Sequence, residues 1–137
     1  MSMTFETPDD VEAAFYAAFS SADIEAMKQV WADSAQAVCV HPMSAPLYGF
    51  AAIFESWSNI LGNGGGRIAH QTLYRRLEGN LAIHGIEERL SLPQGVEARM
   101  HATHVYVNEP KAGWKLLIHH ASPLPVPSQA RPESALH

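Results

Sequence analysis

The chain has 137 residues, and its composition of 47% hydrophobic and 17% charged residues is typical of one packed globular domain. Its formal net charge of −5 disfavours nucleic-acid binding, because no excess of basic residues would draw it to a polyanion. Charged residues, histidine or glycine interrupt each apolar stretch before the roughly 18 residues that a membrane helix needs, and the acidic N-terminus lacks a signal-peptide pattern. We therefore expect a cytoplasmic protein without membrane contact, and the single cysteine, Cys39, agrees with a reducing compartment.

Two short helices are predicted in tandem near the N-terminus. Thr7 can cap the first, Pro8 fits its first position, and two acids follow that favour the positive end of the helix dipole. Apolar residues then recur at helical spacing as far as Phe19. Asp23 can cap a second helix, because the same apolar spacing resumes over residues 24–31.

A strand and a third helix follow. Residues 36–40 are β-branched or apolar and predict a strand that ends at His41, where the next residue is a proline that cannot donate to a sheet. A loop leads to Gly49, and apolar residues three or four apart predict a helix over residues 50–61. The glycine run behind this helix lacks the ending of a phosphate-binding loop, so we interpret it as a flexible connection.

The remainder of the chain has the pattern of a β-meander. Turn signals rich in Gly, Pro and Asn separate four β-type segments at 67–77, 81–92, 96–108 and 114–122. Helices first and strands last indicate an α+β domain in which the helices cover one face of a curved antiparallel sheet. We expect this domain over residues 1–123 and a Pro-rich, disordered tail over residues 124–137.

Several of these local signals occur together in one characteristic order. They are the Thr7-Pro8 helix start, the 24–31 helix, the strand ending at His41, the Gly49 helix start before Trp57, and the closing segment 114–123. In this order and spacing the chain resembles the SnoaL-like group of the nuclear transport factor two superfamily, close to the association domain of calcium/calmodulin-dependent protein kinase II. The resemblance implies a cone-shaped, cystatin-like roll with a pocket between helices and sheet, and a homodimer formed through the outer sheet face. It implies little about chemistry, because the fold hosts isomerases, dehydratases, cyclases, transport factors and assembly modules.

The eight histidines raise the question of a metal site. His101 and His104 are three apart in a predicted strand, and His119 and His120 are adjacent, so the members of each pair point to opposite faces. No His-x-His, helical His-x-x-x-His or Cys-x-x-Cys pattern occurs in the sequence. A cross-strand site stays open as an alternative, but we expect neither a metal nor a cofactor.

Three residues are candidates for catalysis: His41, His120 and Tyr48. Strand alternation places His120 toward the pocket with Trp114 unless a bulge intervenes, because Lys115 on the other face must reach solvent. His41 lies at the end of its predicted strand, and the family resemblance implies that this position is at the mouth of the pocket. An imidazole can serve as general acid or base near neutral pH, and a buried tyrosine hydroxyl can polarise a carbonyl. The alternatives are that these histidines belong to the core or a dimer interface, and that Tyr48 closes a loop.

The candidate ligand-binding residues are aromatic, imidazole and guanidinium side chains: Trp31, Trp57, His104, Tyr106 and Arg89. His104 and Tyr106 share a strand face with small residues, which suits a pocket wall, and an inward arginine would favour a carboxylate ligand. The tryptophans could instead be plain core residues. One member of the adjacent pair Glu87 and Glu88 must face inward, but the alternation does not say which.

Two functions therefore fit the sequence. One is general acid–base chemistry on a small hydrophobic or carboxylate ligand, as in an isomerase, dehydratase or cyclase. The other is a non-catalytic dimerisation, assembly or ligand-binding module, because the predicted strands carry apolar residues on both faces. A Tyr-plus-Asp pair of the steroid-isomerase type is not recognisable, which leaves the reaction open.

Overall fold

The computed structural model describes residues 3–64, 66–91, 95 and 97–125. Three helices precede the long strands: α1 (Pro8–Ser21), α2 (Ile24–Val30) and α3 (Phe50–Gly62). The two predicted caps are confirmed, because the Thr7 side chain accepts from the Asp10 backbone N–H at 3.1 Å and Asp23 accepts from that of Ala26 at 3.0 Å. Local sequence signals thus define where α1 and α2 begin.

The strands form one six-stranded sheet among the described residues. Their bounds are β1 (Val38–Val40), β2 (Leu47–Tyr48), β3 (Arg67–Glu78), β4 (Leu81–Ser91), β5 (Glu97–Glu109) and β6 (Gly113–Pro123). The order across the sheet is β2-β1-β6-β5-β4-β3, and every neighbouring pair is antiparallel except β1 with β6. The predicted four-strand meander is confirmed, whereas the short strand β2 lies in a segment that we expected to be a loop.

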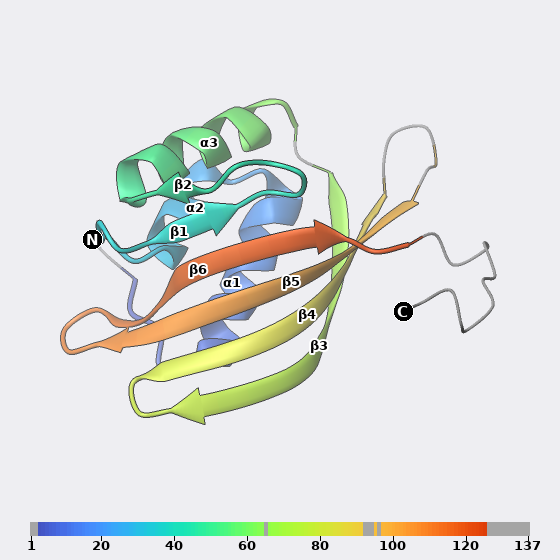
Figure 1. Ribbon diagram of the computed structural model, residues 1–137. Coiled ribbons are helices and arrows are strands. Elements are labelled where there is room, and N and C mark those ends of the chain that lie inside the picture. Colours follow the sequence, from blue (N-terminus) through green and yellow to red (C-terminus); the bar gives the residue numbers. More distant parts are fainter. Residues whose placement is uncertain (1–2, 65, 92–94, 96, 126–137) are drawn as a thin grey trace.

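The helices lie together on one side of the curved, unclosed sheet (Figure 1). Apolar side chains of α1, α2 and α3 pack against the inward residues of β4, β5 and β6, and this contact forms the core. The members with no exposed surface include Val11, Phe15, Met27, Ile53, Ile86 and Leu116. The expected α+β fold, with N-terminal helices on a curved sheet, is confirmed.

A β-bulge in β6 decides which residues reach the inner face of the sheet. Val105 of β5 pairs with Ile118 but the next residue, Tyr106, pairs with Leu116, so Leu117 is an extra residue in β6. Alternation therefore restarts after the bulge, and His119 is buried on the inner face. His120 is exposed on the outer face. Our expectation that His120 points into the pocket is wrong, because it assumed an uninterrupted alternation from Trp114.

The outer face of the sheet carries a continuous apolar row. The register aligns Ile83 of β4 with Val105, Val105 with Ile118 of β6, and Ile118 with Val38 of β1. All four residues are partly exposed in the single chain.

The expected tail over residues 124–137 falls mostly outside the described residues. Of its described part, Leu124 donates its backbone N–H to the Arg99 carbonyl oxygen at 2.9 Å, which extends contact with β5 by one residue. Among the described residues, the helices are all too short or too polar to cross a membrane.

Candidate functional site

An apolar cavity of about 180 Å³ lies between the helices and the inner face of the sheet. Helices α1 and α3 form one wall, and strands β4, β5 and β6 form the other. Its polar members are Glu88, His41 and His119, which face a lining that is otherwise hydrophobic. The apolar lining consists of Phe15, Phe19, Pro42, Trp57, Ile60, Leu90, Met100 and Ala121. A mostly apolar cavity with a small number of polar groups is the usual composition of a small-molecule site.

Glu88 is a buried carboxyl group on the sheet wall of this cavity. Only 4% of the residue is exposed, and the Tyr16 hydroxyl of α1 donates a hydrogen bond to its Oε2 at 2.5 Å. Burial raises the pKa of Glu88, because it disfavours the charged form, and the hydrogen bond from Tyr16 offsets only part of that effect. Glu88 is therefore shifted toward the neutral acid, which is the form that can give up a proton.

His119 lies beside Glu88 on the same wall and is equally buried, with 3% exposed. Burial, together with the nearby His41 and His120, lowers the pKa of His119 to about 3. Its Nδ1 lies 2.8 Å from Nε2 of His104, which has no exposed surface and whose pKa burial also lowers far below the usual value. Both rings are consequently neutral at physiological pH.

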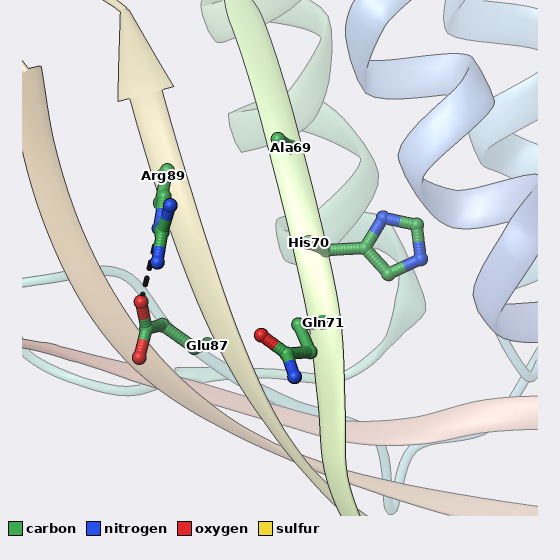
Figure 2. Close-up of a pocket in the computed structure, with 5 residues that line it drawn as sticks. All are labelled: Ala69, His70, Gln71, Glu87 and Arg89. Atoms are coloured by element: carbon green, nitrogen blue, oxygen red, sulfur yellow. Dashed lines mark hydrogen bonds and ion pairs between the residues drawn. The ribbon is translucent and has the colours of Figure 1, made fainter.

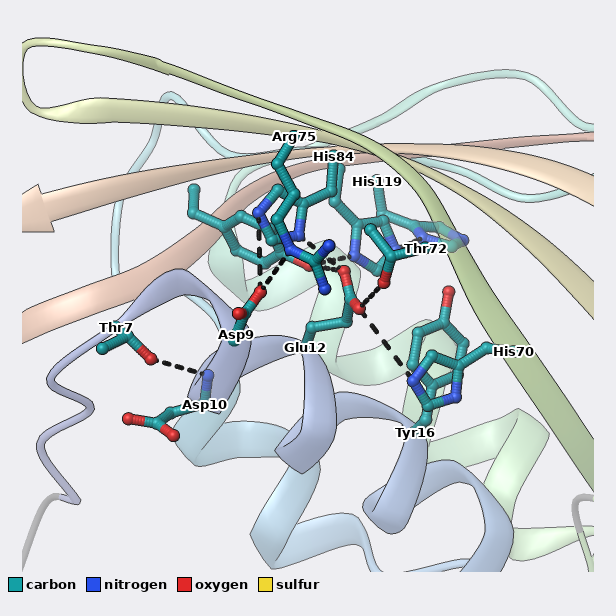
Figure 3. Close-up of polar contacts among 12 residues, drawn as sticks. Thr7, Asp9, Asp10, Glu12, Tyr16, His70, Thr72, Arg75, His84 and His119 are labelled. Atoms are coloured by element: carbon teal, nitrogen blue, oxygen red, sulfur yellow. Dashed lines mark hydrogen bonds and ion pairs between the residues drawn. The ribbon is translucent and has the colours of Figure 1, made fainter.

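A third polar centre, Glu12 of α1, lies behind the two rings. Its Oε1 accepts a hydrogen bond from His84 Nδ1 at 2.7 Å and another from the Tyr106 hydroxyl at 3.2 Å, and Thr72 donates to its Oε2. Figure 3 shows Glu12 projecting from the helix toward Thr72 and His84 of the sheet. Burial raises the pKa of Glu12, but the hydrogen bonds from His84 and Thr72, together with the electrostatic influence of His84 and His70, outweigh burial and lower it overall. Glu12 is thus a buried carboxylate, whereas Glu88 is shifted toward the acid.

His41 completes the polar lining of the cavity. Its Nε2 lies 2.8 Å from the Ser56 hydroxyl of α3, and its ring meets the Trp57 indole edge-to-face at 5.0 Å. Burial lowers the pKa of His41 as well. The side chain is held by α3 and presents a neutral imidazole to the cavity.

The structure brings together only part of the predicted site. His41 and Trp57 line the cavity, whereas His104 and Tyr106 lie behind His119 and do not line it. The other predicted residues lie elsewhere in the fold. Tyr48 is 69% exposed in the edge strand β2, and Trp31 ends α2 beside a separate surface groove. Their positions, like the outward turn of His120, depend on tertiary packing that the local pattern does not specify.

Arg89 is exposed on the opposite face of the sheet from the cavity. Figure 2 shows it beside Glu87 in a shallow hollow along β3, and its Nε donates to Glu87 Oε2 at 3.1 Å. Arg99 also donates to Glu87, and both contacts lower the pKa of this carboxyl. Glu87 is therefore the outward, ion-paired member of the Glu87–Glu88 pair.

Glu88, His104 and His119 have ligand atoms within 4.8 Å of one another, so the cross-strand metal alternative needs a geometric test. Two nitrogens at about 2.05 Å from a tetrahedral Zn²⁺ would be about 3.3 Å apart. The observed distance between His104 Nε2 and His119 Nδ1 is 2.8 Å, which is the length of a hydrogen bond. This distance favours a hydrogen bond between the two nitrogens over the binding of one metal ion by both.

Sequence reasoning missed Glu12, Tyr16 and His84, turned His119 inward only if a bulge intervened, and left Glu88 undecided. The signal for the β4 members was present: Ala82, Ile86 and Leu90 alternate as inward residues, and this places His84 and Glu88 on the same face. Glu12 and Tyr16 are one helical turn apart and flank the buried Phe15, so they too could be assigned to the inner side of α1.

The family model of the SnoaL-like domain matches residues 9–127. A solved structure from Thiobacillus denitrificans, provisionally named as a calcium/calmodulin-dependent protein kinase type II association domain, is 34% identical. That alignment covers 90% of this chain and 100% of the other, with a TM-score of 0.83.

Two further structures confirm the fold. One from Streptomyces avermitilis, provisionally named as a dehydratase of the nuclear transport factor two-like family, is 27% identical over 88% of this chain and 100% of the other, with a TM-score of 0.72. A domain of unknown function with a cystatin-like fold from Nostoc punctiforme is 13% identical over 86% of this chain and 75% of the other, with a TM-score of 0.70. No curated protein matches the chain. With this fold and a family match that spans most of its length, the chain belongs to the SnoaL-like domain family of nuclear transport factor two-like proteins.

Proposed function

We propose that the cavity binds a small hydrophobic molecule with a carbonyl or hydroxyl group, and that Glu88 and His119 transfer a proton on it. One observation carries this proposal: an acid and a base with oppositely shifted pKa values share one apolar wall, with a Glu88 oxygen and a His119 ring nitrogen within 4.8 Å. Pairs of titratable groups whose environments separate their protonation states are typical of acid–base sites. His119 is the proposed base and Glu88 the proposed acid.

The size and composition of the cavity limit the substrate. A volume of about 180 Å³ is below the roughly 300–1,000 Å³ of sites for drug-sized ligands, so a small substrate is favoured. The acid can protonate a departing hydroxyl or a carbonyl oxygen, while the base removes a proton from the neighbouring carbon. Dehydration and isomerisation both need this pair, and the provisional name of the Streptomyces avermitilis structure agrees with the first.

A matched pair of adjacent variants tests the proposal. Thermal melting of wild type, His119→Ala and His120→Ala against enones, hydroxyketones and small carboxylates should give a shift with one compound class. Ligand at 100 times its Kd stabilises a fold by about 2.7 kcal/mol, which is several degrees in a domain of this size. We expect the shift to persist in His120→Ala and to be lost in His119→Ala. Equal shifts in both variants, or no shift with any compound, would contradict the proposal.

A second candidate function, assembly, is favoured by the outer apolar row of Ile83, Val105, Ile118 and Val38. The relative from Thiobacillus denitrificans, provisionally named as an association domain, agrees with it. We propose that two chains pair through this row as a homodimer, which would bury residues that a single chain leaves partly exposed. Sedimentation velocity at micromolar concentration should give a dimer for wild type and a monomer for Ile118→Glu. A wild-type monomer would exclude this pairing.

A further inference from the structure

Four buried polar side chains form a continuous row that leads from the cavity to Glu12 of α1. Starting at the cavity, they are His119 of β6, His104 and Tyr106 of β5, and Glu12 of α1. The distances are 2.8 Å from His119 Nδ1 to His104 Nε2, 2.8 Å from His104 Nδ1 to the Tyr106 hydroxyl, and 3.2 Å from that hydroxyl to Glu12 Oε1. None of the four is more than 4% exposed. Water therefore does not compete for these contacts.

The Glu12 end of the row fixes the direction of every hydrogen bond in it. The Glu12 carboxylate can only accept, and the single Tyr106 proton must lie between the two oxygens, since two facing lone pairs would repel in this buried setting. The Tyr106 oxygen then accepts from His104 Nδ1–H, which leaves His104 Nε2 without a proton. His104 Nε2 accepts from His119 Nδ1–H in turn. Nε2 of His119, a residue that lines the cavity, is left without a proton.

We propose that this row is a proton relay that lets His119 act as a base without becoming charged. A bound molecule gives a proton to His119 Nε2, His119 Nδ1–H passes its proton to His104 Nε2, and His104 Nδ1–H passes its proton to the Tyr106 oxygen. Tyr106 passes its own proton to Glu12 Oε1. Four bonds to hydrogen form, at His119 Nε2, His104 Nε2, the Tyr106 oxygen and Glu12 Oε1. Four bonds to hydrogen break: one in the bound molecule and three in the protein. The negative charge moves from Glu12 to the bound molecule, and the reverse sequence returns the proton.

The relay explains how a buried, neutral His119 could still accept a proton. A buried imidazolium at His119 is strongly disfavoured, so an isolated His119 would be a weak base. In the relay both rings stay neutral and only Glu12, which already carries hydrogen bonds from His84 and Thr72, changes its charge. The catalytic use of the relay rests on the proposed function, whereas its proton positions exist without a ligand.

Other titratable groups face both ends of the row. Around Glu12 they are His84 on β4, His70 on β3 at 4.0 Å, and the exposed ion pair of Asp9 with Arg75; around the two rings they are His41, His120 and Glu88. A pH titration of the row must therefore follow Glu12 itself as well as the rings.

Two-bond ¹H–¹⁵N spectra of the histidine rings test the relay in ligand-free protein. In wild type at pH 7, His104 and His119 should both be neutral with the proton on Nδ1. In Tyr106→Phe the His104 Nδ1–H would lose its acceptor, and because a buried orphan N–H is more costly than an orphan acceptor, both rings should switch to the Nε2–H form. His120→Gln, on the outer face, should leave both rings unchanged. A proton on Nε2 in wild type, a charged ring at pH 7, or the same tautomer in wild type and Tyr106→Phe would overturn the relay.

A titration of wild type gives a second test that does not depend on the folding of a variant. Protonation of Glu12 on lowering the pH should switch both rings to the Nε2–H form, with the same midpoint as the Glu12 carboxyl ¹³C signal. Imidazolium signals with that midpoint would overturn the relay. If both rings show the expected tautomers but no compound shifts the melting temperature, the relay is retained and the proposed function is contradicted. If a compound gives a His119-dependent shift but the rings lack the expected tautomers, the proposed function is retained and the relay is overturned.

Discussion

Lowering the pH from 7.5 to 5.0 should reduce the free energy of unfolding by about 2 kcal/mol, because buried histidines stay neutral in the fold. An unfolded histidine binds a proton near pH 6.5, whereas burial lowers the pKa of His119 to about 3 and that of His104 far below its usual value. Below pH 6.5 the unfolded state therefore binds more protons than the folded state, and stability falls as the pH falls. His119 alone contributes about 2 kcal/mol at pH 5, and His104 adds to the same loss.

Urea unfolding at half-unit pH steps measures this loss. His119→Gln should make the profile shallower between pH 6.5 and 5, because one proton-binding difference is removed, while His120→Gln should leave the slope unchanged. Glu88 acts in the opposite direction: its raised pKa lets the fold retain a proton above about pH 4.3 that the unfolded chain has lost. An identical pH slope in wild type and His119→Gln would contradict a neutral, buried His119 in the folded protein.

Replacing Glu88 by glutamine should lower kcat/KM by about 10²- to 10⁴-fold for any compound that the protein converts. Glutamine keeps the shape of the side chain and an oxygen that can accept from Tyr16, but it cannot release a proton at this position. The thermal stability of the variant should therefore stay near that of wild type while turnover is lost. In wild type, kcat/KM should fall as rising pH removes the proton from Glu88. Because burial raises the pKa of Glu88, this fall should occur above the usual carboxyl range.

The neighbouring residue provides the control for this loss. Glu87→Gln changes the same functional group one position earlier in β4, but its side chain lies on the outer face with Arg89 and Arg99. We expect its kcat/KM to remain within about twofold of wild type, because outer-face ion pairs do not touch the cavity. Comparable losses in Glu87→Gln and Glu88→Gln would contradict the assignment of Glu88 as the acid.

The fold could be predicted where the signals were local. The caps at Thr7 and Asp23 and the apolar spacing of residues 50–61 depend on neighbours within a few positions, so α1, α2 and α3 start where the sequence indicates. The four long strands follow from turn residues between them in the same way. The parallel pairing of β1 with β6 joins residues some 80 positions apart, as in Val38 with Ile118, and no local pattern encodes it.

The candidate site could be predicted only in part, because it depends on register. Unbroken alternation correctly places His104 and Tyr106 of β5 on the inner face. In β6 the same rule fails at Leu117, whose extra position is set by pairing with β5 and not by its residue type. Tyr48 is exposed for a related reason, since β2 lies at the sheet edge beyond the cavity.

The bulge at Leu117 also determines how this site tolerates insertions and deletions. If Leu117 paired with Val105 and the bulge were lost, every later residue of β6 would move by one position, turning His120 inward and His119 outward. Deleting Leu117 has a different result, because Ile118 would still pair with Val105 and His119 would still pair with His104. An imidazole therefore faces the helices whether the bulge is kept or lost, but it meets His104 only where Val105 pairs with Ile118.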